Sequence, residues 1–134
     1  LARNSSLNNP SNFVIDYQAN FLYFCEEFSN RIRSIDLNSN ILSTIVGNGS
    51  SFAGPDGSLT NETGIFSPQG LALDSNNRIL YYSETLNHII RKVNLTENPR
   101  RVFTIAGTNG VRGFFGENNS NASLALLNEP TNLF

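Results

Sequence analysis

Histidine, glutamate and arginine are the side chains of this 134-residue chain whose spacing could support acid–base or metal chemistry. His88 is the only histidine, and an imidazole can act as a general base or bind a metal ion. Glu84 and Arg91 lie on either side of it. Glu26 and Arg33 stand at the same relative positions earlier in the chain, since 84 − 26 and 91 − 33 both equal 58. One hypothesis is therefore a ring of acid–base groups built from repeated units.

The repetition of these residues favours a structural role over a catalytic one. Asn30 occupies the position of His88 in the earlier copy, so no second imidazole accompanies the first. Catalytic groups are usually confined to one site, whereas groups that satisfy hydrogen-bond donors and acceptors recur in every copy. A metal site would need ligands from beyond these residues. We therefore predict no catalytic residue, no metal site and no cofactor within the chain.

The single cysteine and two oxygen-rich segments are the other candidates for chemistry. Cys25 lies in an apolar run, which predicts a buried and unreactive thiol. The segments 55–58 and 117–120 carry oxygen ligands of the kind that Ca²⁺ takes, but they lack a regular alternation of acidic residues. The glycines that follow Val46 and Ala106 do not form a phosphate-loop motif. We interpret these four segments as turns or loops.

Short strands separated by polar turns are predicted to position these residues. Aromatic and β-branched runs indicate strands, and consecutive apolar residues indicate strands that are covered on both faces. Asp16 and Asp74 are expected to form the turns that follow the first strand of each copy. Strands are expected at 13–16, 21–25, 31–36 and 41–46, again at 71–74, 79–83, 89–94 and 101–106, and at the start of a third copy at 132–134.

A long glycine-rich loop follows the fourth strand in each copy. The loops begin at Gly47 and Gly107, and their glycines permit backbone conformations with positive φ. We expect Phe52 and Phe114 to pin the loops to the core. One short helical turn is expected within 123–127.

The strands and loops repeat with a nearly fixed period. Prolines open the repeats at Pro10, Pro68 and Pro130, with spacings of 68 − 10 = 58 and 130 − 68 = 62 residues. Four-stranded units of this length are typical of β-propellers. We therefore predict an all-β fold, namely a β-propeller segment of four-stranded antiparallel blades. Residues 1–9 would end a preceding repeat's loop, 10–67 form the first blade, 68–129 form the second, and 130–134 begin a further blade.

A blade of this kind has two apolar faces, which it covers by packing between neighbouring blades. A closed propeller needs at least about four blades. The chain also contains no methionine, so it does not begin at a translation start. We expect it to be a piece of a longer protein whose flanking blades are its first partners. The isolated piece is expected to be unstable or to aggregate.

The second copy resembles the NHL repeat, a family named for its Asn-His-Leu signature. Asn87-His88-Ile89 is similar to the signature turn, with isoleucine in place of leucine, and Ile90-Arg91-Lys92 is similar to the strand that follows. Pro68-Gln-Gly resembles the opening Pro-x-Gly strand, while Glu84 stands where the family usually has aspartate. The first copy is weaker, with Ser29-Asn30 where Asn-His is expected.

The resemblance covers nearly the whole chain and implies a propeller, commonly of six blades, that serves mostly as a binding platform. Family members include ubiquitin-ligase-like proteins of the cytosol, extracellular receptors and protein kinases, and a few related propellers are enzymes. The structural repeat signature would comprise Asp16, Glu26, Asn30, Arg33, Asp74, Glu84, Asn87, His88 and Arg91.

Our first functional hypothesis is a non-catalytic scaffold for protein–protein interaction or ligand binding within a larger protein. Its binding surface would consist of the turns between strands and the long loops, because loops on a rigid scaffold carry variable recognition. One alternative is a part of a metal-dependent propeller lyase or hydrolase. The other is the sensor ectodomain of a receptor, such as a receptor kinase.

Charge and hydropathy limit the classes of partner that this chain is expected to bind. The formal net charge of −2, with only 15% charged residues, implies no strongly basic face, so we predict no nucleic-acid partner. No apolar run is long enough to span a membrane. Asn-x-Ser/Thr patterns would accept glycans in a secreted protein, which leans slightly toward an extracellular location. They begin at Asn4, Asn48, Asn61, Asn94, Asn118 and Asn121.

Overall fold

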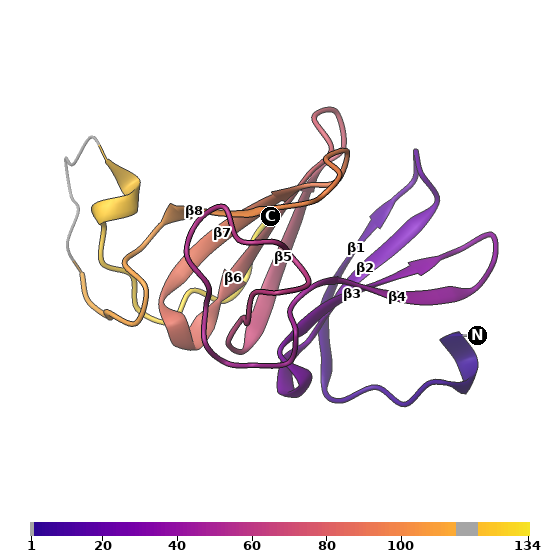
Figure 1. Ribbon diagram of the computed structural model, residues 1–134, viewed down its shortest axis with the longest axis horizontal. Coiled ribbons are helices and arrows are strands. Elements are labelled where there is room, and N and C mark those ends of the chain that lie inside the picture. Colours follow the sequence, from indigo (N-terminus) through magenta and orange to yellow (C-terminus); the bar gives the residue numbers. More distant parts are fainter. Residues whose placement is uncertain (1, 115–120) are drawn as a thin grey trace.

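Two four-stranded antiparallel sheets make up the computed structural model, which describes residues 2–114 and 121–134 (Figure 1). In each sheet the strands pair with their neighbours in chain order. The first sheet contains β1 (Pro10–Asp16), β2 (Phe21–Glu26), β3 (Arg31–Asp36) and β4 (Ile41–Val46), and the second contains β5 (Pro68–Asp74), β6 (Ile79–Glu84), β7 (Ile89–Asn94) and β8 (Val102–Ala106). The predicted all-β class is confirmed.

The first strand of each sheet is longer than predicted. β1 and β5 begin at their prolines, and the pairing register shifts between Pro10 and Phe13 and between Pro68 and Leu71. Such an irregularity tolerates a proline, which has no amide hydrogen for the ladder. Residues 132–134 were predicted as a strand, and this was wrong, because they run without strand pairing.

Four single-turn 3₁₀ helices complete the described elements: η1 (Ala2–Asn4), η2 (Glu27–Ser29), η3 (Thr85–Asn87) and η4 (Ala122–Leu124). η2 and η3 join the second and third strands of their sheets and lie at the same lower edge of Figure 1. η4 is the short turn expected near the end of the chain. Within the described residues, no helix has the length and apolar character needed to cross a membrane.

The hydrophobic core lies between the two sheets. Tyr23, Cys25 and Ile32 of the first sheet and Leu80 and Tyr82 of the second are almost fully buried in one cluster. Directly opposed residues such as Cys25 and Ile32 share one face of a sheet. Each sheet therefore turns one apolar face toward the other, and this packing fixes how the turns and loops are placed.

The long loop between β4 and β5 is held by residues other than those predicted. Phe52 and Phe114 are 84% and 91% exposed, so the expectation that they pin the loops was wrong. Ile65 is fully buried instead, and the amide of Gly54 donates to Thr63 Oγ1 at 2.9 Å. Ile65 and the bond between Gly54 and Thr63 therefore anchor the loop, while the Phe52 side chain stays exposed.

Candidate functional site

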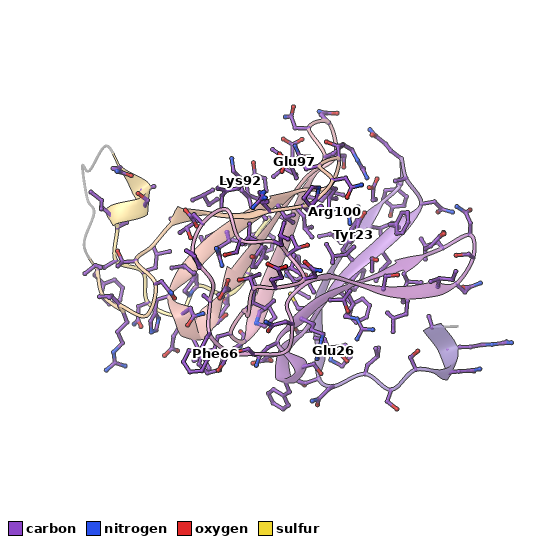
Figure 2. All side chains as sticks on the ribbon, viewed as in Figure 1. Tyr23, Glu26, Phe66, Lys92, Glu97 and Arg100 are labelled. Carbon is purple, nitrogen blue, oxygen red and sulfur yellow. The ribbon has the colours of Figure 1, made fainter. Side chains whose placement is uncertain are left out.

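Glu26 and Glu84 end the second strand of each sheet, and both side chains are almost completely buried. Glu26 Oε1 accepts the amide of Asn8 at 2.8 Å, and its Oε2 accepts Arg33 Nη1 at 2.8 Å. Figure 2 places Glu26 at the lower edge of the molecule. Each carboxylate thus receives a backbone amide from the segment that precedes its own sheet, as well as an arginine from the neighbouring strand.

The second sheet surrounds its carboxylate with more donors. Glu84 Oε2 accepts the amide of Phe66 at 3.2 Å and Asn87 Nδ2 at 2.6 Å, while Oε1 lies 3.4 Å from Arg91 Nη1. Burial raises the pKa of Glu84, and Arg91 and Asn87 oppose that rise. Because Glu84 is 0% exposed, its carboxylate faces these donors rather than an open cleft.

Arg91 links its sheet to the loop that precedes it. The side chain is 1% exposed, and Nη2 donates to Gly54 O at 3.0 Å and lies 3.4 Å from Asp56 Oδ1. Asp56 Oδ1 also accepts the amide of Thr104 at 2.8 Å, so the loop closes over the outer strand β8. Arg33, at the equivalent position, donates instead to Ser43 O and is 19% exposed.

Asn30 and His88 have the same backbone conformation and perform the same task. They end η2 and η3 with left-handed φ values of 52° and 59°. Asn30 Oδ1 accepts the amide of Ser67 at 3.1 Å, and His88 Nδ1 accepts the amide of Glu129 at 3.1 Å. Both acceptors therefore hold the segment that leads into the next repeat. The imidazole uses Nδ1 as an acceptor here, so its other nitrogen carries the proton.

Asp16 and Asp74 close the turns after the first strands, as expected. Asp16 Oδ1 accepts the amides of Gln18 and Ala19, and Asp74 Oδ1 accepts those of Asn76 and Asn77. Hydrogen bonds from the Asn77 side chain and from these amides lower the pKa of Asp74. These contacts support a structural role for the predicted signature residues, which stays a prediction.

Cys25 is 0% exposed, and burial raises the pKa of its thiol to about 12. A thiol that stays protonated is a poor nucleophile. Asp56, in the first oxygen-rich segment, already faces Arg91 and the amide of Thr104. The second segment, 117–120, lies outside the described residues. Within the described part of the chain, no three His, Cys, Asp or Glu side chains gather as a metal site would require.

The predicted glycan acceptors differ in how their side chains are engaged. Asn48 Nδ2 donates to Glu62 O at 2.7 Å, whereas Asn94 Oδ1 accepts the amide and the hydroxyl of Thr96. Asn4 and Asn61 are exposed. Asn118 lies outside the described residues, and Asn121 caps η4. Use of any of these sites stays a prediction.

Large exposed apolar side chains occur on the two 3₁₀ turns η2 and η3 and on the loops that follow the fourth strands. Phe28 and Leu86 stand at equivalent positions of the two 3₁₀ turns and are 68% and 44% exposed. Phe52 precedes Ala53, which forms an isolated β-bridge with Gly64, and its carbonyl oxygen lies close to Gly64. Phe114 directly follows Gly113, whose amide donates to Leu127 O. We call Phe28, Phe52, Leu86 and Phe114 the turn edge.

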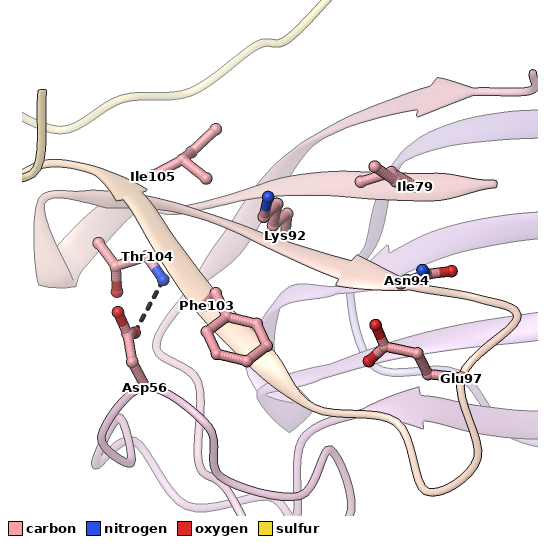
Figure 3. A pocket seen from close by; sticks show the side chains of 8 residues that line it. All are labelled: Asp56, Ile79, Lys92, Asn94, Glu97, Phe103, Thr104 and Ile105. Atoms are coloured by element: carbon pink, nitrogen blue, oxygen red, sulfur yellow. Dashed lines mark hydrogen bonds between the residues drawn. The ribbon is translucent and has the colours of Figure 1, made fainter. Parts of the chain in front are cut away.

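A pocket of about 450 Å³ lies away from the turn edge, over β6, β7 and β8 (Figure 3). Ile79, Lys92, Phe103 and Ile105 contribute to its wall. The equivalent positions of the first sheet include Ser34 and Ile45, which the second sheet buries to 1% and 9% exposure. This pocket is therefore the outward-facing counterpart of the packed interface between the sheets.

Comparison with known proteins identifies relatives at low identity. The chain is 28% identical over 102 residues to NHL repeat-containing protein 2 of Bos taurus, and 28% identical over 92 residues to the human protein of that name. These matches cover 76% and 69% of this chain, but only 14% and 12% of the relatives. The resemblance to NHL repeats is confirmed. No family model matches the chain.

Solved structures show the same fold as these NHL-type repeats. A protein of unknown function from Bacteroides thetaiotaomicron superposes with a TM-score of 0.76 at 18% identity, over 96% of this chain and 31% of that one. An auxiliary nutrient binding protein from the same organism gives a TM-score of 0.63 at 19% identity, over 90% of this chain and 31% of that one. The chain thus spans about a third of each neighbour's length.

Proposed function

We propose that this chain is a non-catalytic NHL-type propeller segment that binds a protein partner through its turn edge, as part of a larger protein. The observation that supports this most is the exposure of the turn-edge side chains, between 44% and 91%, with Phe28 and Leu86 at equivalent positions of the two repeats. Aromatic side chains are enriched among the residues that dominate binding energy at protein interfaces. A rigid blade presents them without a large ordering cost.

The repeat explains how such an edge is built. Each sheet contributes one apolar residue from its 3₁₀ turn, Phe28 or Leu86, and one phenylalanine from the loop that follows its last strand. Buried contacts of Glu26, Glu84 and Arg91 hold these turns and loops to the sheets. The framework therefore fixes the backbone of the edge, while its apolar side chains stay available to a partner.

The second candidate function is the binding of a small-molecule ligand by the same segment. Two solved neighbours are named auxiliary nutrient binding proteins, and their identities of 19% and 20% show the fold alone. A groove of about 480 Å³ runs between the first strands and the end of the chain, with Val14, Leu71, Ala72 and Leu133 in its wall. An apolar small molecule would fit the chemistry of this groove.

The test is a cross-linked pull-down from cell extract. Its baits are two variants of the longest natural protein that contains this chain. Phe28→Ala combined with Phe52→Ala removes two aromatic groups from the turn edge. Tyr17→Ala is the matched control, because Tyr17 is 85% exposed and lies in the β1–β2 turn at the opposite end of the sheet. We expect the double variant alone to lose specific partners. Equal capture by both variants, with unchanged circular dichroism, would refute the proposed site.

A further inference from the structure

A further cavity lies between the loop that precedes the second sheet and the loop that follows it. Its volume is about 500 Å³, and its wall includes residues 53–56 of the first loop and 107–109 of the second. Arg91 of β7 and Thr104 of β8 complete the wall, and the pairing register places both on the face that Tyr82 turns toward the first sheet. This inter-loop cavity is therefore separate from the outward faces of the two sheets.

Arg91 brings an unused hydrogen-bond donor to the inter-loop cavity. Its side chain is 1% exposed, with Nη1 facing Glu84 and Nη2 donating to Gly54 O. Its Nε is buried and has no hydrogen-bond partner among the described residues, whereas Nε of the equivalent Arg33 donates to Ser43 O at 3.3 Å. A buried N–H group without a partner costs free energy and is rare in folded proteins. A ligand in the cavity that Arg91 lines can supply the missing acceptor.

Asp56 supplies an acceptor to the same cavity. Its Oδ1 accepts the amide of Thr104 at 2.8 Å, which Figure 3 shows, and lies 3.4 Å from Arg91 Nη2. The Asp56 side chain is 50% exposed, and an ionised carboxylate has lone pairs for several donors. Apolar groups complete the wall, namely Ala53, Pro55 and Ile89. The cavity thus combines a donor, an acceptor and apolar surface.

A difference between the two repeats leaves space beside Gly107. The first sheet has Arg31 at the position of Ile89, since 89 − 31 equals 58. Arg31 Nη2 donates to Asn48 O at 3.2 Å, and a Cβ added at Gly49 would lie 2.6 Å from this nitrogen. Arg31 therefore occupies the space beside its own glycine-rich loop, which the shorter Ile89 cannot reach across. The signature residues recur in both repeats, but this substitution belongs to the second repeat.

We propose that the inter-loop cavity binds a neutral sugar, either free or at the end of a glycan chain. A sugar hydroxyl both donates and accepts, so one hydroxyl accepts from Arg91 Nε while a neighbouring one donates to Asp56. The C–H groups of the ring pack on the apolar wall. Because the carboxylates of Glu84 and Asp56 outnumber the one guanidinium, the site disfavours an anion. The volume falls in the range of small-molecule sites, and the proposal does not depend on the turn edge.

The first experiment measures which sugars bind the longest natural protein that contains this chain. Saturation-transfer NMR is recorded with D-glucose, D-galactose and D-mannose, with the disaccharide maltose, and with D-glucuronate as an anion of similar size. We expect at least one neutral sugar to bind, and D-glucuronate to bind at least about tenfold more weakly than D-glucose, because like charges repel. Tighter binding of maltose than of D-glucose would identify the end of a glycan chain, and equal binding a free sugar. If no neutral sugar binds at about 20 mM, well above the Kd of a weak site, the proposal is overturned.

The second experiment assigns the bound sugar to the inter-loop cavity. Asn109 is exposed and lines the cavity, so Asn109→Trp should fill it and abolish binding of the neutral sugar. Asn76→Trp is the matched control, because Asn76 is equally exposed but lies in the turn between β5 and β6, outside the cavity wall. Equal sugar affinity of the two variants would place the binding elsewhere and overturn the proposal.

A third variant tests the role of the carboxylate without altering the shape of the cavity. Asp56→Asn keeps an oxygen for the amide of Thr104 but removes the charge. It should weaken binding of the neutral sugar about tenfold, as expected for the loss of a charged hydrogen-bond acceptor, and should reduce the discrimination against D-glucuronate. Unchanged affinities for both ligands would overturn the proposal, and this comparison decides if circular dichroism shows that Asn109→Trp fails to fold. Partner capture in the pull-down is a separate readout, so the two proposals fail independently.

Discussion

At positions 30 and 88, one side-chain acceptor atom from each residue holds its sheet to the segment that follows. Asn30 offers Oδ1 to Ser67, and His88 offers Nδ1 to Glu129, from the same left-handed backbone conformation. The two side chains place an acceptor at the same distance from the backbone, which explains how histidine and asparagine can alternate in one signature. At this scale the histidine acts as a hydrogen-bond acceptor for the segment that follows its sheet.

His88→Asn should therefore preserve stability, while His88→Ala should lower the free energy of unfolding by about 1 kcal/mol through the loss of one hydrogen bond. Urea denaturation of the two variants, at one fixed protein concentration, measures the difference. Asn30→Ala is the matched change in the first sheet and should cost a similar amount. A His88→Asn variant as unstable as His88→Ala would refute the shared acceptor role.

At the level of elements, each sheet contains one glutamate–arginine ion pair that joins its strands to the neighbouring turn or loop. In the second sheet, Glu84 and Arg91 are 0% and 1% exposed, and Arg91 also ties β7 to the preceding loop. In the first sheet, Arg33 is 19% exposed and bonds only within its own sheet. The Glu84–Arg91 pair should therefore contribute more to the free energy of unfolding than the Glu26–Arg33 pair.

Arg91→Met should lower the free energy of unfolding by about 3 kcal/mol, because it leaves a buried carboxylate without its counter-charge. Arg33→Met should lower the free energy of unfolding by less than Arg91→Met does. Burial already raises the pKa of Glu84, and removing Arg91 should raise it further. A raised pKa favours the folded state below the ordinary glutamate value of about 4.3, and this advantage is lost as the pH rises through the folded-state pKa.

The cost of Arg91→Met should accordingly shrink on acidification, and denaturation series between neutral pH and about pH 4 would show it. Arg33→Met provides the comparison at each pH. A cost for Arg91→Met that is constant across this range would mean that Glu84 does not depend on Arg91 for its charge.

The elements themselves follow from the sequence more readily than their contacts do. The period of 58 residues predicts eight strands, and all eight are present. The exposure of Phe52 and Phe114 was not predicted, because an apolar residue in a glycine-rich loop carries no periodicity that would assign it to a face. The bond from Glu129 to His88 joins positions 41 residues apart, a separation that a local pattern does not encode.

The chain as a whole consists of two equivalent sheets that pack against each other through one face each. The core between them is continuous, and Asp16 and Arg78 add an ion pair across it. In repeat architectures of this kind, stability is approximately the sum of each unit and its contacts with neighbours. Such a molecule gains stability when a further unit packs against either of its sheets.

The dependence of urea unfolding on protein concentration tests this account most directly. We predict a low unfolding midpoint, with aggregation as the concentration of the 134-residue chain increases from about 1 to 100 μM, because the two sheets lack the neighbouring blades that stabilise repeat units. A cooperative transition of a monomer, with the same midpoint at every concentration, would contradict the account.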